Sequence, residues 1–200
     1  MTILPYVHQN QKFAYVAYHN KVAYSPEEMR QIKGYGHTFR KGETYQLFCW
    51  HDVWFPVYCC FELASIHDRA LFHSYADLVV AVEWNTDIAY FSTIIESLCR
   101  DLHCYCIQAN SSGPGDSRVL RPSRSDQRDM IKTKGGKNPC ILATNIDIKA
   151  LREFQRVDYI LQRDDRSFKP TPPKLDQEIL KQKREGTLFQ MMCKKVTSMV

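Results

Sequence analysis

Apolar positions along the chain alternate between short continuous runs and helical spacing, which predicts strands and helices in turn. Leu78–Val82 is an uninterrupted apolar run, typical of a strand covered on both faces. A helix is predicted over Asp87–Leu102, and a strand over His103–Ala109 with Cys104, Cys106 and Gln108 on one side. The order strand, helix, strand favours a layered α/β (α+β) architecture with helices packed on a sheet.

A hairpin and a sharp turn precede that unit. Tyr45–Trp50 and Val53–Tyr58 are rich in β-formers and are separated only by His51-Asp52, which predicts a hairpin. The second strand ends at Cys59-Cys60, and the next segment has helical apolar spacing, from which we expect a buried face formed by Leu63, Ile66, Ala70 and Leu71. A cysteine between a strand and a helix could be a nucleophile whose thiol pKa is lowered by the helix N-terminus. The alternative is a pair of buried cysteines acting as small apolar residues.

The flanking segments place further polar residues at strand ends. A strand over Gln11–Asn20 leads to Lys21, and a loop with a short helix to Lys33 carries Glu28. Shorter strands are predicted over 117–120, 129–133 and 140–148, and helices over 149–157 and 175–184. We expect an α/β domain over 1–157, then a proline-containing linker and a helical tail over 158–200. Such a tail packs on a second copy or another domain, or is poorly ordered.

Composition limits the class of protein without choosing a function. The chain has 200 residues, enough for one domain with a core that needs no disulfide framework. Its eight cysteines, with no secretory signal and no apolar run of membrane-spanning length, predict reduced thiols, a cytoplasmic location and no membrane contact. A net charge of +5 permits a nucleic-acid partner but does not require one.

Six short motifs follow one another along the chain. They are Tyr18-His19-Asn20-Lys21 with Pro26 and Glu28, Phe39-Arg40-Lys41-Gly42-Glu43, Cys60-Phe61-Glu62, Gln108-Ala109-Asn110, Gly115-Asp116-Ser117-Arg118-Val119 with Pro122, and Asn145-Ile146-Asp147-Ile148. In this order they resemble the motifs of the carbon–nitrogen hydrolase (nitrilase and amidase) superfamily. The resemblance spans about residues 13–155 and also extends to the nitrilase-like segment of certain defence-associated reverse transcriptases. It implies an incomplete four-layer α-β-β-α sandwich.

The same resemblance implies a reaction and a site. Cys60 would attack a small nitrile or non-peptide amide and form a thioester, Lys21 would stabilise the tetrahedral intermediate, and Glu28 would orient the site. Substrate-pocket residues would be Glu62, Trp84, Asn85 and Asn110. No cofactor and no metal is expected, and the family suggests a homo-oligomer or association with a missing N-terminal region.

One departure from the family leaves the activity open. The family's general-base glutamate lies upstream of the lysine, whereas this chain has no Glu or Asp before Lys21. The chain is therefore a fragment of a longer protein, receives its base from another polypeptide, or is catalytically inactive. In the last case it would be a non-catalytic assembly module or a nucleic-acid-associated module.

The sequence also contains residues from which two other kinds of site could be built. A metal site drawn from Cys59, Cys60, His103, Cys104 and Cys106 has no Cys-x-x-Cys pair, so core packing explains these cysteines better. A basic region over 118–137 is diluted by acidic residues and has few aromatics, so nucleic-acid binding is not favoured.

Overall fold

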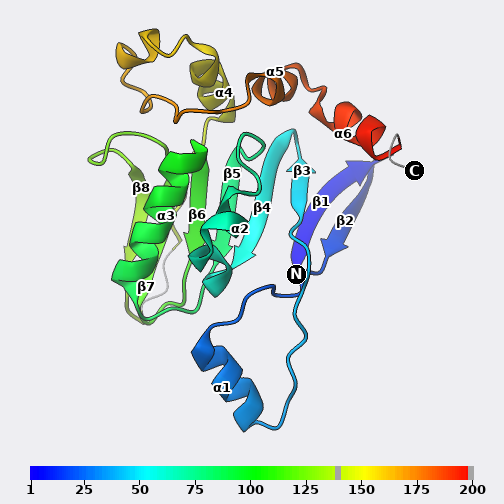
Figure 1. Ribbon diagram of the computed structural model, residues 1–200, viewed down its shortest axis with the longest axis vertical. Coiled ribbons are helices and arrows are strands. Elements are labelled where there is room, and N and C mark those ends of the chain that lie inside the picture. The colour runs from blue at the N-terminus through cyan, green and yellow to red at the C-terminus, as the bar shows by residue number, and fades with distance from the viewer. Residues whose placement is uncertain (138–140, 198–200) are drawn as a thin grey trace.

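The largest element is a six-stranded sheet with the order β3-β4-β5-β6-β7-β8 (Figure 1). The computed structural model describes residues 1–137 and 141–197, with side-chain positions up to residue 192. Strands β4, β5 and β6 are parallel, and the outer strands pair antiparallel. The strands are β3 (Leu47–Trp50), β4 (Val53–Cys59), β5 (Leu78–Val82), β6 (Tyr105–Ala109), β7 (Gly115–Leu120) and β8 (Asp129–Lys134). The predicted hairpin, central strand and α/β class are confirmed.

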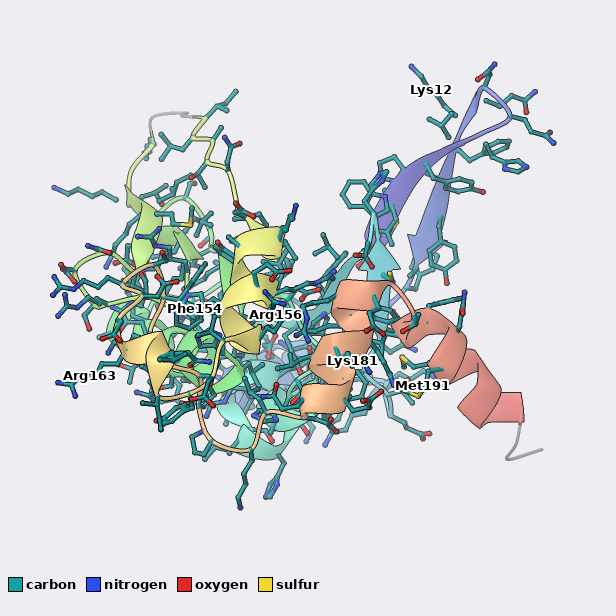
Figure 2. All side chains as sticks on the ribbon, turned by 90° about the horizontal axis from the view of Figure 1, so that it is seen from above. Lys12, Phe154, Arg156, Arg163, Lys181 and Met191 are labelled. Carbon is teal, nitrogen blue, oxygen red and sulfur yellow. The ribbon has the colours of Figure 1, made fainter. Side chains whose placement is uncertain are left out.

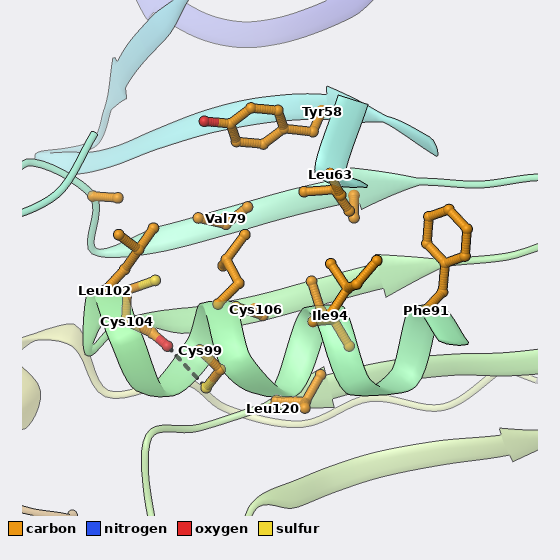
Figure 3. Close-up of a cluster of buried hydrophobic side chains, with 14 residues drawn as sticks. Tyr58, Leu63, Val79, Phe91, Ile94, Cys99, Leu102, Cys104, Cys106 and Leu120 are labelled. Carbon is orange, nitrogen blue, oxygen red and sulfur yellow. Dashed lines mark hydrogen bonds between the residues drawn. The ribbon is translucent and has the colours of Figure 1, made fainter. Parts of the chain in front are cut away.

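Helix α3 (Ile88–Leu102) covers one face of this sheet, together with the 3-10 helix η1 (Cys60–Ala64) and helix α2 (Ile66–Ala70) (Figure 1). Ile94 and Leu102 of α3 lie in one apolar cluster with Val79 of β5 and Cys106 of β6 (Figure 3). The Cys99 thiol donates a hydrogen bond to the Cys104 carbonyl oxygen at 3.1 Å. Burying each large apolar side chain contributes roughly 1.5–3 kcal/mol, so this cluster fixes α3 on the sheet.

Helix α4 (Ile148–Arg156) packs on the second apolar cluster, which includes sheet residues from the opposite face. Its Leu151 and Phe154 are buried with Leu78, Tyr105 and Phe168. Asp147 caps the helix by accepting a hydrogen bond from the Ala150 amide. The predicted helix over 149–157 is confirmed, and it gives the sheet a cover on its second face.

A buried ion cluster joins α4 and α5 (Gln177–Glu185) to the start of β5. Asp77, fully buried, accepts hydrogen bonds from the Arg152 guanidinium, from Lys183 Nζ at 3.1 Å and from the Trp54 amide at 3.0 Å. Burial lowers the pKa of Lys183, while Asp77 opposes that effect. A buried carboxylate is tolerated only when it is paired in this way, so the cluster holds both helices in place.

The C-terminal segment makes further contacts with the sheet. Leu188, the first residue of α6 (Leu188–Thr197), is buried with Ile179 and Trp54. Phe168 and Thr171 are also buried, although they lie in the proline-containing segment. Residues 158–192 therefore pack on the preceding part of the chain, and the division at 157 stays a prediction.

A separate two-stranded sheet is formed by β1 (Thr2–His8) and β2 (Gln11–Ala17). This hairpin projects from the body of the molecule, with Lys12 near its tip (Figure 2). The Trp50 indole donates to the Pro5 carbonyl oxygen at 2.8 Å, which ties the hairpin to β3. The described chain thus has a helix-covered six-stranded sheet and a small second sheet, as expected for an incomplete α-β-β-α sandwich.

Two expectations about local structure are wrong. Ile66 and Leu71 are 71% and 53% exposed, because a 3-10 turn and a five-residue helix meet at Ser65 and form no continuous apolar face. Of the four apolar residues expected to be buried, Leu63 alone is fully buried. No strand forms over 141–147, where Ile141 is 98% exposed. Cys140, the start of that predicted strand, lies outside the described residues. No helix in the described part of the chain has the length and apolarity needed to cross a membrane.

Candidate active site

Cys60 sits at the turn where β4 gives way to the 3-10 helix. Its backbone has a φ of +49°, a conformation that is strained for a residue with a side chain. The turn is held by Glu62, which accepts a hydrogen bond from the Cys59 amide at 2.6 Å, and by the buried Leu63. The sequence prediction of a sharp strand-to-helix turn at this cysteine pair is confirmed.

Glu62 connects this turn to the segment that follows β2. One carboxylate oxygen bonds the Cys59 amide, and the other accepts from the Val22 amide at 2.6 Å and bonds His19 Nε2 at 2.7 Å. Its side chain is fully buried. Since Val22 adjoins Lys21 and Cys59 adjoins Cys60, this one carboxylate fixes the lysine segment against the cysteine turn.

Lys21 pairs with Glu28 of helix α1 (Pro26–Gly34), a helix that begins with a capping box. Ser25 caps this helix: its hydroxyl accepts from the Glu28 amide, and its own amide donates to Glu28 Oε2 at 2.7 Å. Burial would raise the pKa of Glu28, but the hydrogen bonds from Lys21 and Ser25 outweigh burial and lower it. Glu28 is therefore an ionised partner that holds the lysine ammonium in place.

A cavity of ≈ 480 Å³ brings these side chains together. It lies between α1 and the carboxyl ends of β4 and β5, and Lys21, Glu28 and Cys60 all line it. Figure 1 shows α1 beyond the end of the sheet at which β4 terminates. Residues remote in sequence thus meet at one sheet edge, as the strand-end argument predicted. The remaining lining residues are Ser25, Glu27, Gln31, Cys59, Val82, Glu83, Trp84, Asn85 and Thr86.

The predicted pocket residues divide into two groups. Trp84 and Asn85 line the cavity, and the Trp84 side chain is 78% exposed. Asn110 does not line it: its side chain accepts from the Asn85 amide at 2.9 Å and donates to the Asn85 carbonyl oxygen at 2.9 Å. Glu62 likewise lies behind the cavity wall. Asn110 and Glu62 therefore support the lining segments.

The two cysteine thiols at the turn are neutral groups. Burial raises the pKa of Cys60; the Trp84 backbone amide and Lys21 lower it, and the nearby Glu83 raises it further. Burial also raises the pKa of Cys59. The expectation that the helix N-terminus lowers the thiol pKa is wrong, because burial outweighs the favourable contacts. A nucleophilic Cys60 would need a proton acceptor.

Glu83, which stands with Trp84 and Asn85 at the end of the predicted central strand, also lines the cavity, although the family resemblance gave it no role. It directly follows β5 and is 6% exposed, with Oε2 bonded to the Gln108 amide at 3.1 Å. Burial raises its pKa to about 7, Gln108 opposes the rise and Asp116 adds to it. The signal for it was available, since Val79, Ala81 and Glu83 alternate along a buried strand and share one face.

The rival sites find no support in the geometry. Among residues 1–137 and 141–197, no group of three or more His, Cys, Asp or Glu side chains is arranged to hold a metal. Cys104 and Cys106 are fully buried in the apolar cluster under α3. In the basic region, Arg118 pairs with Glu96 and Asp116, and Lys132 pairs with Asp116, so part of its charge is neutralised within the fold.

No family model and no curated protein matches the sequence. Among solved structures, a CN-hydrolase superfamily protein from Xanthomonas campestris, with an arsenic adduct in its active site, matches with a TM-score of 0.51 and 15% identity. This match covers 80% of this chain and 61% of that chain. The chain has the CN-hydrolase fold.

An amidase from Nesterenkonia sp. matches the CN-hydrolase-fold chain with a TM-score of 0.48 and 17% identity, over 62% of this chain and 47% of the amidase. A variant of that amidase in complex with butyramide matches with a TM-score of 0.47, at 17% identity, over 62% of this chain and 49% of that one. The chain thus spans about half to three-fifths of the length of these structures. Nothing in the comparisons supports the resemblance to a reverse-transcriptase segment.

Proposed function

We propose that this CN-hydrolase-fold chain hydrolyses a small nitrile or non-peptide amide through a thioester on Cys60. The observation that carries the proposal is the convergence of Lys21, Glu28 and Cys60 on one cavity, from three separate segments of the chain. A cysteine at a strained turn and a buried lysine beside it are the groups that acyl transfer needs.

Each residue has a distinct role in the proposed reaction. The Cys60 sulfur attacks the substrate carbon, and the Lys21 ammonium lies where negative charge develops on the substrate oxygen or nitrogen. Glu28, ionised and hydrogen-bonded to Lys21, keeps that ammonium in position. The exposed Trp84 and the buried Asn85 form the wall beside the thiol and contact the substrate.

The first experiment measures thiol reactivity and turnover separately. Intact-mass analysis after iodoacetamide treatment should show preferential labelling of Cys60, and butyramide or butyronitrile should release ammonia. Cys60→Ala should abolish both. Lys21→Met should slow ammonia release by about 10²–10³-fold, the usual cost of removing a group that stabilises the developing oxyanion. It should also slow labelling, because Lys21 lowers the pKa of Cys60.

Matched cysteine variants make the result specific. Cys49 is exposed and lies on β3, so Cys49→Ala should leave the labelling of Cys60 unchanged. If labelling survives in Cys60→Ala and is lost in Cys59→Ala, the nucleophile is Cys59 and the proposal fails. Equal labelling of both cysteines, insensitive to Lys21→Met, would also refute it.

A second candidate is a non-catalytic assembly module, with a second copy of this chain as the partner. The β1–β2 hairpin favours it, because large apolar side chains on both strands are exposed: Ile3, Tyr6, Val7, Phe13, Tyr15 and Val16. Exposed apolar surface of this kind commonly marks an interaction site. Sedimentation velocity tests it: Phe13→Lys with Tyr15→Lys should convert an oligomer to a monomer, and a monomeric wild type would exclude self-assembly.

A further inference from the structure

Glu83 occupies the candidate active site without a role in the proposed chemistry. It lines the same ≈ 480 Å³ cavity as Cys60 and Lys21. Its carboxylate is held on one side only: Oε2 accepts from Gln108, while the buried Oε1 has no hydrogen-bond partner among the described residues. A buried acceptor without a partner is costly, and such atoms are concentrated at functional sites.

The Cys60 thiol, which lines the same cavity, donates no hydrogen bond to a side chain among the described residues. Cys60 is half-buried and its pKa is raised, so the sulfur carries its proton near neutral pH. The ionised carboxylate of Glu28 is already engaged by Lys21 and Ser25. The third acidic residue that lines the cavity, Glu27, is exposed and bonded to Arg30 and Gln31 of α1. Glu83 is thus the cavity carboxylate with a free buried oxygen.

We propose that Glu83 is the proton acceptor and donor for Cys60. This inference rests on the proposed function and adds a catalytic residue to it. Gln108 is a positioning residue, because its amide holds Oε2 and leaves Oε1 for the proton.

The proton balance closes with Glu83 alone. Oε1 takes the Cys60 proton as the carbon–sulfur bond forms and the carbonyl π electrons move to the oxygen beside Lys21. The carboxylic acid then protonates the leaving nitrogen as the carbon–nitrogen bond breaks. Water next attacks the thioester and gives a proton to Glu83, which returns it to the departing sulfur. A carboxyl with a pKa near 7 suits both directions of transfer.

The deciding experiment is the pH profile of Cys60 alkylation by iodoacetamide, measured by intact mass in the wild type and in Glu83→Gln. In the wild type the rate should rise through an inflection near pH 7 and then level off. Glu83→Gln should lose this inflection and react about 10²-fold more slowly at pH 8, the usual contribution of a general base.

The opposite result is expected if Glu83 is only a neighbouring charge. Its negative charge raises the pKa of Cys60, so removing it would then speed alkylation or leave it unchanged. Either outcome overturns the proposal. Glu83→Asp, which keeps the carboxylate but shortens its reach, should retain the inflection at a reduced rate; loss of the inflection in this folded variant would also count against it.

Controls separate the chemistry from folding and from the proposed function. Glu153→Gln, at an exposed position paired with Arg156, should leave the profile unchanged. Gln108→Leu removes the bond that lowers the Glu83 pKa, so the inflection should move to higher pH. If Glu83→Gln abolishes the inflection but the wild type releases no ammonia from any amide, the role of Glu83 as proton acceptor is supported and the proposed hydrolase function is refuted. If Glu83→Gln releases ammonia as fast as the wild type, the hydrolase function is supported and the role of Glu83 is refuted.

Discussion

Glu62 provides the sharpest test of how the cysteine turn and the lysine segment are held together. Its buried carboxylate accepts from the amides of Val22 and Cys59, both at 2.6 Å, and bonds His19 Nε2 at 2.7 Å. Glu62→Gln keeps the shape and the buried volume, but it replaces one acceptor oxygen with an amide NH₂. We expect the new donor to face either the Cys59 amide or the His19 and Val22 pair.

The expected loss of stability in Glu62→Gln follows from the hydrogen bonds that the substitution removes. A hydrogen bond to a charged group contributes about 1.5–3 kcal/mol, and an unsatisfied buried donor costs about 1–3 kcal/mol. Glu62→Gln should therefore lower the free energy of unfolding by about 3 kcal/mol, and for a chain of this size lower Tm by about 6–12 °C. Alkylation of Cys60 should also slow, because Lys21 and Cys60 are no longer fixed relative to each other.

Denaturant unfolding monitored by tryptophan fluorescence gives the stability, and intact-mass kinetics give the alkylation rate. Glu153→Gln removes an exposed carboxylate and should change the free energy of unfolding by less than about 0.5 kcal/mol. A Glu62→Gln variant as stable as that control would show that the carboxylate does not hold the two segments. Lost stability with unchanged alkylation would refute the positioning role alone.

Three further perturbations test other parts of the structure. Gly42→Ala should slow Cys60 alkylation, because a Cβ there would lie 1.9 Å from the Asn20 carbonyl oxygen and displace the lysine segment; an unchanged rate would refute this. His103 is buried and its pKa is lowered to about 4 by burial, so its contribution to stability is full above pH 6.5 and is lost as the pH falls toward 4. The free energy of unfolding of the wild type should be about 2–3 kcal/mol lower at pH 4.5 than at pH 7, and His103→Gln should reduce this difference. An equal difference in the variant would show that His103 does not cause the loss. Asp77→Asn should cost about 3–5 kcal/mol because it leaves buried cations unpaired, and Lys183→Met should cost clearly less; equal costs would contradict this account of the cluster.

The Glu83 carboxyl predicts a pH dependence of opposite sign to that of His103. The pKa of Glu83 in the folded protein, about 7, lies above the ordinary 4.5. Its contribution to the free energy of unfolding is therefore fully present below pH 4.5 and is lost as the pH rises through 7. The free energy of unfolding of Glu83→Gln, measured relative to the wild type, should therefore be higher at pH 8 than at pH 5 by up to about 3 kcal/mol. A difference that does not change with pH would show that Glu83 ionises in the folded protein as it does in the unfolded chain.

The sequence by itself determined the elements whose signals are local. The apolar run of β5, the helical spacing of α3 and the hairpin leading to the cysteine turn were all predicted, because each depends on periodicity within a few residues. The motif order predicted the CN-hydrolase fold and singled out Lys21, Glu28 and Cys60. Local pattern failed where tertiary contacts decide: Ile66 stands in a helical apolar pattern yet remains exposed.

Only the tertiary structure decided how the site is ionised and held. Burial around Cys60 raises its thiol pKa, and no sequence motif reports how much water a side chain has lost. Glu62 joins segments 40 residues apart, and burial raises the pKa of Glu83, with Asp116 adding to the rise and the hydrogen bond from Gln108 opposing it. These are properties of neighbours in space, set by the packing of α3 on the sheet and of the lysine segment against the cysteine turn, so no local pattern could give the ionisation of the site.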